Sequence, residues 1–175
     1  MPWTVSDVDK HKAGLSEKSK KQWTRIANSV LKREMKKDRN VILITADMGF
    51  GMFDKIKSEL PDQYYNVGAA EQTMMDMAVG FALSGKLPVT YTITPFYFRA
   101  FETLRTYIDF ENIPVLMVGS GRDDDYKAGF SHYAGDDNIL NMLKNIVCLH
   151  PQDSESYDFK EIIYSKRPTY LNLKR

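Results

Sequence analysis

The sequence is poor in cysteine and has no long apolar run. Cys148 is the single cysteine among 175 residues, so the chain cannot form an internal disulfide, and a reducing cytoplasm is the expected compartment. We interpret Cys148 as a small core residue, because it lies in the apolar run "NIVCL". No apolar stretch approaches the length of a bilayer span, and residues 1–14 lack a signal peptide's apolar core. These absences predict a cytoplasmic protein with no membrane partner.

An excess of charge of either sign is also missing. The chain has 24 Lys and Arg against 23 Asp and Glu, a formal net charge of +1, which argues against a dedicated nucleic-acid or membrane binder. The charge is unevenly spread, because residues 1–40 hold eleven basic and five acidic residues (11 − 5 = +6), leaving about −5 for the remaining residues. A basic leader can indicate contact with RNA or DNA.

Apolar side chains within this leader recur at helical spacing, so we expect a docking helix instead of a nucleic-acid arm. Ser16 is the expected N-cap, basic residues cover the solvent face, and residues 1–15 are expected to form an irregular arm. The apolar stripe is also a candidate surface for contact with a partner. Its members are Trp23, Ile26, Ala27, Val30, Leu31 and Met35.

From residue 40 onward, strand and helix patterns alternate. "VILITAD" (41–47) is a short continuous β-branched run, which is typical of a strand buried on both faces. The alternation predicts an α/β fold, a three-layer sandwich with a mostly parallel sheet covered by helices on both faces. With 43% hydrophobic residues, residues 16–175 are expected to form a single domain. The expected strands are 41–47, 88–94, 114–120, 145–150 and 169–175, and the expected helices are 53–60, 70–83, 96–110, 136–144 and 153–165.

Ligands of such sheets bind beyond the carboxyl ends of the strands. This rule selects residues 45–49, 66–71, 94–96 and 119–135. Glu71 lies in the second of these segments, in the first turn of a helix that is otherwise almost uncharged. An acid there can simply complement the helix dipole. Its small and apolar neighbours instead predict a partly desolvated carboxylate, which is a strong hydrogen-bond partner for a ring nitrogen.

The stretch "NVGAAEQTMMDMAVGFALSGKLPVTYTITPFYFRAFETLR" (66–105) carries a specific combination. A Gly-Ala-Ala-Glu-Gln turn opens a helix of small residues, and a Phe then precedes Arg-Ala-aromatic-Glu. This pattern resembles the pyrimidine-binding domain of thiamine-diphosphate enzymes of the transketolase group, with the greatest likeness to the C-terminal subunit of split transketolases. The resemblance covers about residues 40–175 and continues into "GFSH" (129–132) and "HPQDSES" (150–156). It implies a thiamine-diphosphate-binding fold of the pyrimidine type.

The resemblance implies specific roles around the cofactor. Glu71 matches the glutamate that hydrogen-bonds N1′ of the aminopyrimidine and thereby activates thiamine diphosphate, which then serves as the electron sink. Phe96 matches an aromatic side chain that stacks on the pyrimidine; as an alternative, it is a core Phe at the start of an aromatic helix. Asp47 matches an acid at the end of the first strand and is assigned to the cofactor pocket.

Three further residues are expected near the substrate. His132 corresponds to the family's histidine beside the reacting carbon, a proton donor or a ligand of a substrate hydroxyl. Arg99 follows the family pattern and is expected in the cofactor pocket, where it could also hold an anionic substrate group. Arg175 matches a sugar-phosphate-binding arginine. A bystander loop histidine and a frayed terminal arginine are the corresponding alternatives.

The sequence departs from the family at positions that serve substrate recognition there. Ala128 stands where relatives carry an Asp, and Gly121 and Arg122 stand where they carry a His. We therefore expect substrates other than the usual pentose phosphates. "GDDN" (135–138) lacks the long spacing of the family's diphosphate and magnesium motif, so no metal site is expected in the chain. The family's C-terminal domain also has no counterpart within the sequence.

These features imply the pyrimidine-domain subunit of a two-subunit transketolase-like transferase, which moves a ketol unit between sugar-like substrates. A diphosphate-binding N-terminal subunit is the expected partner, in an α2β2 assembly that shares thiamine diphosphate and in which the partner binds Mg²⁺. Two alternatives remain open. One is the beta subunit of a 2-oxoacid dehydrogenase or decarboxylase, and the other is a non-catalytic regulatory domain of the pyrimidine type.

Overall fold

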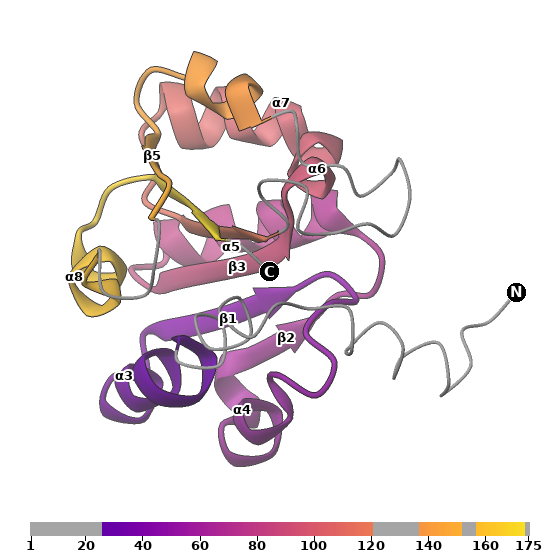
Figure 1. Cartoon of the computed structure of the whole chain (residues 1–175), viewed down its shortest axis with the longest axis vertical. Coiled ribbons are helices and arrows are strands. Elements are labelled where there is room, and N and C mark those ends of the chain that lie inside the picture. The colour runs from indigo at the N-terminus through magenta and orange to yellow at the C-terminus, as the bar shows by residue number, and fades with distance from the viewer. Residues whose placement is uncertain (1–25, 121–136, 152–156, 174–175) are drawn as a thin grey trace, which may run out of the picture.

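A computed structural model describes residues 26–120, 137–151 and 157–173. Its centre is a six-stranded sheet in which every strand pairing is parallel, as Figure 1 shows. The strand order is β2-β1-β3-β4-β6-β5. The strands are β1 (Val41–Thr45), β2 (Tyr64–Asn66), β3 (Leu87–Ile93), β4 (Leu116–Ser120), β5 (Val147–Leu149) and β6 (Thr169–Leu173).

Both faces of this sheet are covered by apolar side chains. Every residue of β1 is buried. Ile42 and Ile44 pack into one hydrophobic cluster, while Val41 and Leu43 pack into the other. Because successive side chains of a strand point to opposite faces, a strand buried on both sides needs a continuous apolar run. The predicted α/β sandwich is confirmed.

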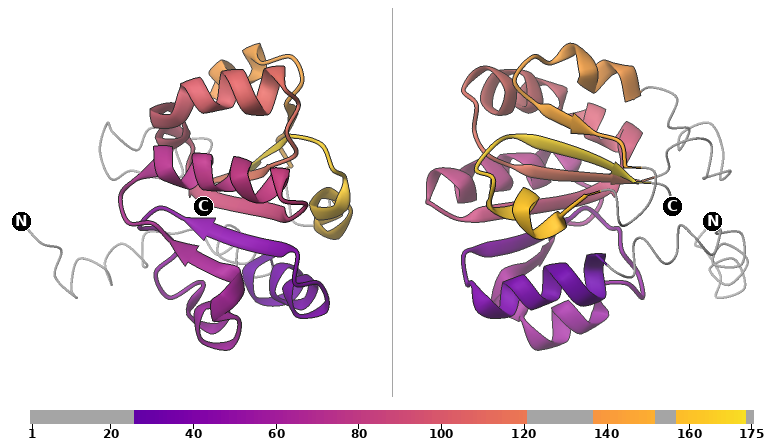
Figure 2. Two further views of the ribbon diagram at one scale, coloured as in Figure 1. Left: turned by 180° about the vertical axis from the view of Figure 1, so that it is seen from behind. Right: turned by 60° about the vertical axis from the view of Figure 1, so that its left-hand side comes forward.

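Helices form a layer on each side of the sheet (Figure 2). One layer contains α5 (Glu71–Leu83) and the helical segment 94–110. The opposite layer contains α3 (Lys32–Lys37), α4 (Asp54–Glu59) and α8 (Phe159–Tyr164). The site discussed below belongs to the first layer.

The segment 94–110 follows directly on β3 and changes its winding along its length. It consists of α6 (Thr94–Tyr97), the 3-10 turn η3 (Phe98–Ala100), α7 (Phe101–Thr103) and the π-helix η4 (Leu104–Phe110). The predicted helix 96–110 therefore exists, but it begins two residues earlier. Pro95 lies in its first turn, where a missing N–H costs no helical hydrogen bond.

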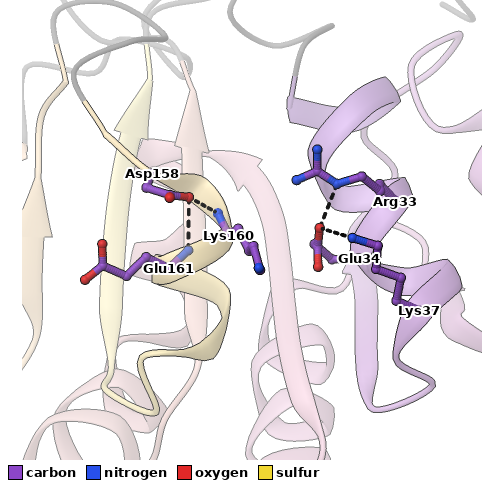
Figure 3. A network of polar contacts seen from close by, with 6 residues as sticks. All are labelled: Arg33, Glu34, Lys37, Asp158, Lys160 and Glu161. Atoms are coloured by element: carbon purple, nitrogen blue, oxygen red, sulfur yellow. Dashed lines mark hydrogen bonds and ion pairs between the residues drawn. The ribbon is translucent and has the colours of Figure 1, made fainter.

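The last two helical segments differ from the prediction, one in where it begins and the other in its type. Helix α8 begins at Phe159 instead of residue 153. The carboxylate of Asp158 accepts hydrogen bonds from the backbone N–H groups of Lys160 (2.9 Å) and Glu161 (3.2 Å), as Figure 3 shows. Such a cap starts a helix after the capping residue. The expected helix 136–144 is a 3-10 helix, η6 (Asp137–Met142).

The sequence did not predict β2 as a strand. Its three residues extend the sheet at one edge, with Leu43 of β1 opposite Tyr64 and Thr45 opposite Asn66. The opposite edge is formed by β5, which also has three residues. A run of three residues is too short for a hydrophobic period to identify.

The apolar stripe of the N-terminal leader is partly described. The π-helix η1 (Ile26–Leu31) leads into α3, and the side chains of Leu31 and Met35 are buried against the sheet of their own chain. The expectation that the stripe contacts a partner is therefore wrong for these two residues. Ser16, Trp23 and the arm 1–15 lie outside the described residues.

Gln63, in the 3-10 turn η2 (Pro61–Gln63), connects the end of α3 to the sheet through hydrogen bonds. Its buried side-chain nitrogen donates to the backbone carbonyls of Met35 (3.0 Å), Asp38 (3.0 Å) and Val41 (2.8 Å). The end of α3 and the start of β1 are thereby held together.

Two smaller observations complete the fold. Cys148 is half-buried in the edge strand β5 and packs against the hydrophobic cluster on the α5 side. Within the described ranges, no helix has both the length and the apolar character needed to cross a membrane.

Candidate functional site

The carboxyl edge of the sheet, where the sequence predicts a ligand site, is formed by the ends of four neighbouring strands. Strands β1, β2, β3 and β4 end at Thr45, Asn66, Ile93 and Ser120. Because all pairings are parallel, these carboxyl ends lie at the same edge of the sheet. The turns that leave them position the candidate site.

The turn from β2 into α5 is organised by Asn66. Its side-chain oxygen accepts hydrogen bonds from the backbone N–H groups of Asp47 and Gly68, both at 3.0 Å. Gly68 has a φ of +72°, a conformation that glycine adopts without steric cost. The sequence interpretation missed Asn66, although Asn two residues before Gly is a recognisable turn signal. Asn66 holds the ends of β1 and β2 in register ahead of Glu71.

Glu71 is the first residue of α5 and is only 4% exposed. The preceding Ala70 has no side chain that could cap the helix, so the carboxylate provides the negative charge at this positive helix end. One carboxylate oxygen of Glu71 accepts a hydrogen bond from Nη1 of Arg99 at 2.8 Å, and the two groups form an ion pair.

Phe96 and Arg99 lie one turn apart in the segment 94–110, so their side chains share a face. The guanidinium carbon of Arg99 is 4.3 Å from the centre of the Phe96 ring, a cation–π arrangement. The Arg99 side chain is 53% exposed. The structure thus brings together three of the predicted site residues, Glu71, Phe96 and Arg99.

A polar triangle joins the two elements that carry these residues. The amide nitrogen of Gln72 donates to Asp76 (2.8 Å) and to the hydroxyl of Thr103 (2.7 Å), and Thr103 donates to Asp76 (2.7 Å). Gln72 and Asp76 belong to α5, and Thr103 belongs to α7. The triangle fixes the position of Glu71 relative to Phe96.

Hydrogen bonds of buried hydroxyl groups hold the start of α6 against the sheet. The Tyr170 hydroxyl donates to Oγ1 of Thr94 at 2.8 Å, and Thr94 donates to the carbonyl of Ser120 at 3.3 Å. Gly119 makes this contact possible, because a Cβ atom there would lie 2.5 Å from the Tyr170 hydroxyl oxygen and 3.0 Å from Oγ1 of Thr94. Residues of β4 and β6 thereby position the helix that carries Phe96.

A second buried phenol lies one residue after Phe96. The hydroxyl of Tyr97 donates to the carbonyl of Val118 at 3.1 Å and lies 3.0 Å from Oγ1 of Thr90. Burial raises the pKa of Tyr97 above its usual range. Its hydroxyl therefore stays protonated and serves as a fixed donor rather than as an acid.

Of the other predicted site residues, the structure describes only Asp47. Asp47 is exposed just beyond β1, has a φ of +49°, and is joined to the Glu71 turn through Asn66. His132 and Arg175 lie outside the described residues, as do Gly121, Arg122 and Ala128. Among the residues that the structure describes, no group of three or more His, Cys, Asp or Glu side chains could hold a metal ion.

The fold and the site define a class of protein. A parallel α/β sheet carries, at its carboxyl edge, a buried glutamate that starts a helix beside a partly exposed aromatic ring. The chain belongs to the transketolase pyrimidine-binding domain family, which matches residues 19–175.

Relatives of known sequence include two kinds of protein. The chain is 31% identical over 140 residues to a 1-deoxy-D-xylulose-5-phosphate synthase of Corynebacterium glutamicum, a match that covers 79% of this chain and 22% of the relative. It is 29% identical over 153 residues to a putative transketolase C-terminal section of Methanocaldococcus jannaschii, covering 80% and 46% of the two chains. The chain thus spans less than half the length of these relatives.

Solved structures show the same fold. A split-gene transketolase, described as an inactive β4 tetramer, superposes with a TM-score of 0.70 at 24% identity, over 90% of this chain and 51% of that one. Transketolase from Campylobacter jejuni gives a TM-score of 0.74 at 18% identity, over 86% and 25% of the two chains. This agreement shows that the chain has the fold of a part of these transketolases.

Proposed function

We propose that this chain is the pyrimidine-domain subunit of a two-subunit, thiamine-diphosphate-dependent transferase of the transketolase type. One observation carries the proposal: in a member of this family, the buried carboxylate of Glu71 lies beside Phe96 at the ligand-binding edge of the sheet. The reaction is the transfer of a two-carbon ketol unit between sugar-like substrates.

The residues present fit the pyrimidine half of the cofactor. The contacts of Arg99 support this fit, because they demonstrate that Glu71 accepts an N–H hydrogen bond from a planar group lying on Phe96. When bound, the cofactor supplies a nucleophilic carbon and an electron sink. Phe96 orients the aminopyrimidine ring by stacking. The Glu71 carboxylate would accept a hydrogen bond from the ring nitrogen and so hold a proton there, which would make the exocyclic amino group more acidic and favour its imino form, whose nitrogen is the base.

The other predicted residues complete the proposed site. Asp47 borders the cofactor pocket at the end of β1. Arg99 and Arg175 bind an anionic group of the substrate, and His132 donates a proton to, or hydrogen-bonds with, a substrate oxygen. The departures at Ala128 and Gly121 support a substrate that differs from the usual pentose phosphates.

The diphosphate end of the cofactor and its Mg²⁺ are proposed to be bound by a separate N-terminal subunit, in an α2β2 assembly. Supporting this are the names of two relatives, a transketolase C-terminal section and a split-gene transketolase. In this division the chain provides Glu71 and Phe96 for the pyrimidine end of the cofactor.

A second candidate function is supported by the sequence relatives. The chain is 31% identical to a 1-deoxy-D-xylulose-5-phosphate synthase over 79% of its length. A synthase of that kind would use a 2-oxoacid donor in place of a ketose. Donor choice therefore separates the two candidates.

The first experiment tests the role of Glu71. Glu71→Gln keeps the size of the side chain but removes its charge, so activation of the cofactor should fall by about 100-fold or more. The measurement is exchange of the cofactor C2 proton in the enzyme assembled with the co-purified partner. Glu102→Gln, which alters an exposed ion pair between α7 and η4, is the control and should leave the exchange rate unchanged. Normal exchange in Glu71→Gln would refute the assignment.

The second experiment identifies the donor. The assembled enzyme is offered ketose phosphates, unphosphorylated ketoses and 2-oxoacids, and the products are identified by mass spectrometry. Ketol transfer from a ketose supports the transketolase-type function, and release of CO₂ from a 2-oxoacid supports the synthase. Efficient turnover of xylulose 5-phosphate with ribose 5-phosphate would contradict the expected change of substrate.

A further inference from the structure

The Arg99 side chain contacts both groups that are assigned to the pyrimidine ring. Its guanidinium donates to Glu71 at 2.8 Å and lies 4.3 Å from the centre of the Phe96 ring. Within the described ranges, Arg99 forms no ion pair other than the one with Glu71. The carboxylate and the aromatic face are thus engaged by a single side chain.

These two contacts have the geometry that an aminopyrimidine needs. A ring nitrogen has to come within about 3 Å of a Glu71 oxygen to form a hydrogen bond, and a stacked ring lies about 4–5 Å from the Phe96 centroid. The guanidinium is likewise planar, donates N–H groups in its plane and stacks on aromatic faces. Any planar group that touches Glu71 and stacks on this face of Phe96 has to occupy the space that Arg99 now fills.

We propose that Arg99 is a competitor for the pyrimidine site, and that its guanidinium must leave Glu71 and Phe96 before the cofactor ring can bind. This inference rests on the proposed function. It adds that Arg99 controls how readily the pyrimidine ring binds. In the cofactor-free chain, Arg99 neutralises the buried carboxylate of Glu71, which would otherwise be an unpaired charge. The same side chain lowers the apparent affinity for the pyrimidine.

The competition is weak enough to be overcome. Half of the Arg99 side chain is exposed, so its guanidinium can move into solvent by side-chain rotation and be hydrated there. An ion pair and a cation–π contact at such a position are each modest. Together they correspond to a reduction in pyrimidine affinity of roughly ten-fold.

The test measures binding of 4-amino-5-hydroxymethyl-2-methylpyrimidine, the pyrimidine fragment of the cofactor, to the full chain by nuclear magnetic resonance titration. Arg99→Met keeps the length of the side chain but removes the planar cation, so it should bind the fragment roughly ten-fold more tightly than the original chain. Arg99→Lys retains a charge without the planar group and should fall between the two. Arg105→Met is the matched control, because Arg105 pairs with Glu102 at 2.7 Å and is 56% exposed, and it should leave the affinity unchanged.

Two results overturn the inference, and they are distinguishable. If Arg99→Met binds the fragment no more tightly than the original chain, while Glu71→Gln still weakens binding, Arg99 is not a competitor and the proposed function stands. If Glu71→Gln changes binding neither in the original chain nor in the Arg99→Met background, Glu71 does not contact the pyrimidine. The proposed function then fails together with the inference.

Discussion

At the scale of single residues, the side chain of Gln63 makes three hydrogen bonds outside the site. Its side-chain nitrogen donates to three backbone carbonyls, one each in α3, the following turn and β1. Gln63→Leu leaves these buried acceptors without their donor, and each such group costs about 1–3 kcal/mol. We expect a loss of about 2–3 kcal/mol in the free energy of unfolding, measured by urea denaturation.

Gln63→Glu is a second variant that tests the same hydrogen bonds more directly. It has nearly the same shape, but a carboxylate oxygen takes the place of the amide nitrogen and faces the three carbonyl oxygens. It should therefore be less stable than Gln63→Leu at neutral pH and should recover part of the loss on acidification, when the carboxyl group gains a proton to donate. Equal stability of all three proteins would show that the hydrogen bonds of Gln63 contribute little.

Glu34 gives a prediction for pH dependence. Its buried carboxylate accepts from Arg33 (2.7 Å) and Lys37 (3.4 Å), as Figure 3 shows. The Arg33 hydrogen bond lowers the pKa of Glu34 below its ordinary value of 4.5, against the opposing effect of burial and with additional help from Lys37. A lowered folded-state pKa stabilises the fold above pH 4.5, and this contribution is lost as the pH falls through the folded value.

The measurement compares the original chain with Glu34→Gln in urea at several pH values. At pH 7 the variant should be less stable by about 1 kcal/mol, since both cationic partners are half exposed and screened by solvent. The difference should shrink steadily as the pH is lowered below 4.5. A difference that stays constant between pH 7 and pH 3 would contradict the assigned cause.

The sequence was sufficient to single out Glu71, because an acid among small and apolar residues is conspicuous in the chain itself. The same pattern did not predict that Arg99 would pair with it. That contact joins residues 28 positions apart, and it exists only because β3 and the segment after it bring Arg99 to the start of α5. A pairing of this kind depends on tertiary structure and has no local period to reveal it.

At the scale of elements, two glycines predict opposite results for the same substitution. Gly119 in β4 faces Tyr170 and Thr94, and a Cβ atom there would come within 3.0 Å of both. Gly119→Ala should therefore destabilise the fold by about 1–3 kcal/mol through overpacking. Gly80 lies exposed within α5 and a Cβ atom there meets nothing within 4 Å. Gly80→Ala should stabilise the fold by about 0.5–1 kcal/mol.

Thermal unfolding of the two variants checks this prediction. The displacement of α6 in Gly119→Ala should also weaken binding of the pyrimidine fragment, because Thr94 begins the helix that carries Phe96. Gly80→Ala should not change fragment binding. If Gly119→Ala leaves the unfolding temperature unchanged, the Tyr170 side chain moves away from the added methyl group without loss of stability, and the prediction is wrong.

Elements with a long and distinct pattern were predicted well, and elements defined by local caps were not. The continuous apolar run of β1 and the small-residue helix α5 were identified within one or two residues of their bounds. Helix α8 was expected six residues too early, since its start depends on the cap by Asp158. The pattern of "FYFRAFETLRTYIDF" indicated a helix, but it contained no sign of the π-helical winding of η4, which is a change of hydrogen-bond partner and not of hydrophobic period.

At the scale of the whole molecule, we expect cofactor binding to require a partner subunit. In calorimetric titrations of this chain alone, thiamine diphosphate should bind weakly, and its affinity should not depend on Mg²⁺. After assembly with the diphosphate-binding subunit, the same titration should show magnesium-dependent binding at least 100-fold tighter. An obligate contact of this kind would bury well over about 1,000 Å². Tight magnesium-dependent binding by the chain alone would contradict the proposed division of the site.

The strand order also has a consequence for how the chain folds during synthesis. Strands β1 to β4 pair with one another in the order β2-β1-β3-β4, so this part of the sheet can form once Ser120 is available. The next strand made, β5, pairs only with β6 among the described strands, and β6 begins twenty residues after β5 ends (169 − 149 = 20). β5 therefore has no neighbour in the sheet while it emerges from the ribosome, and it can join the sheet only once β6 has also been made.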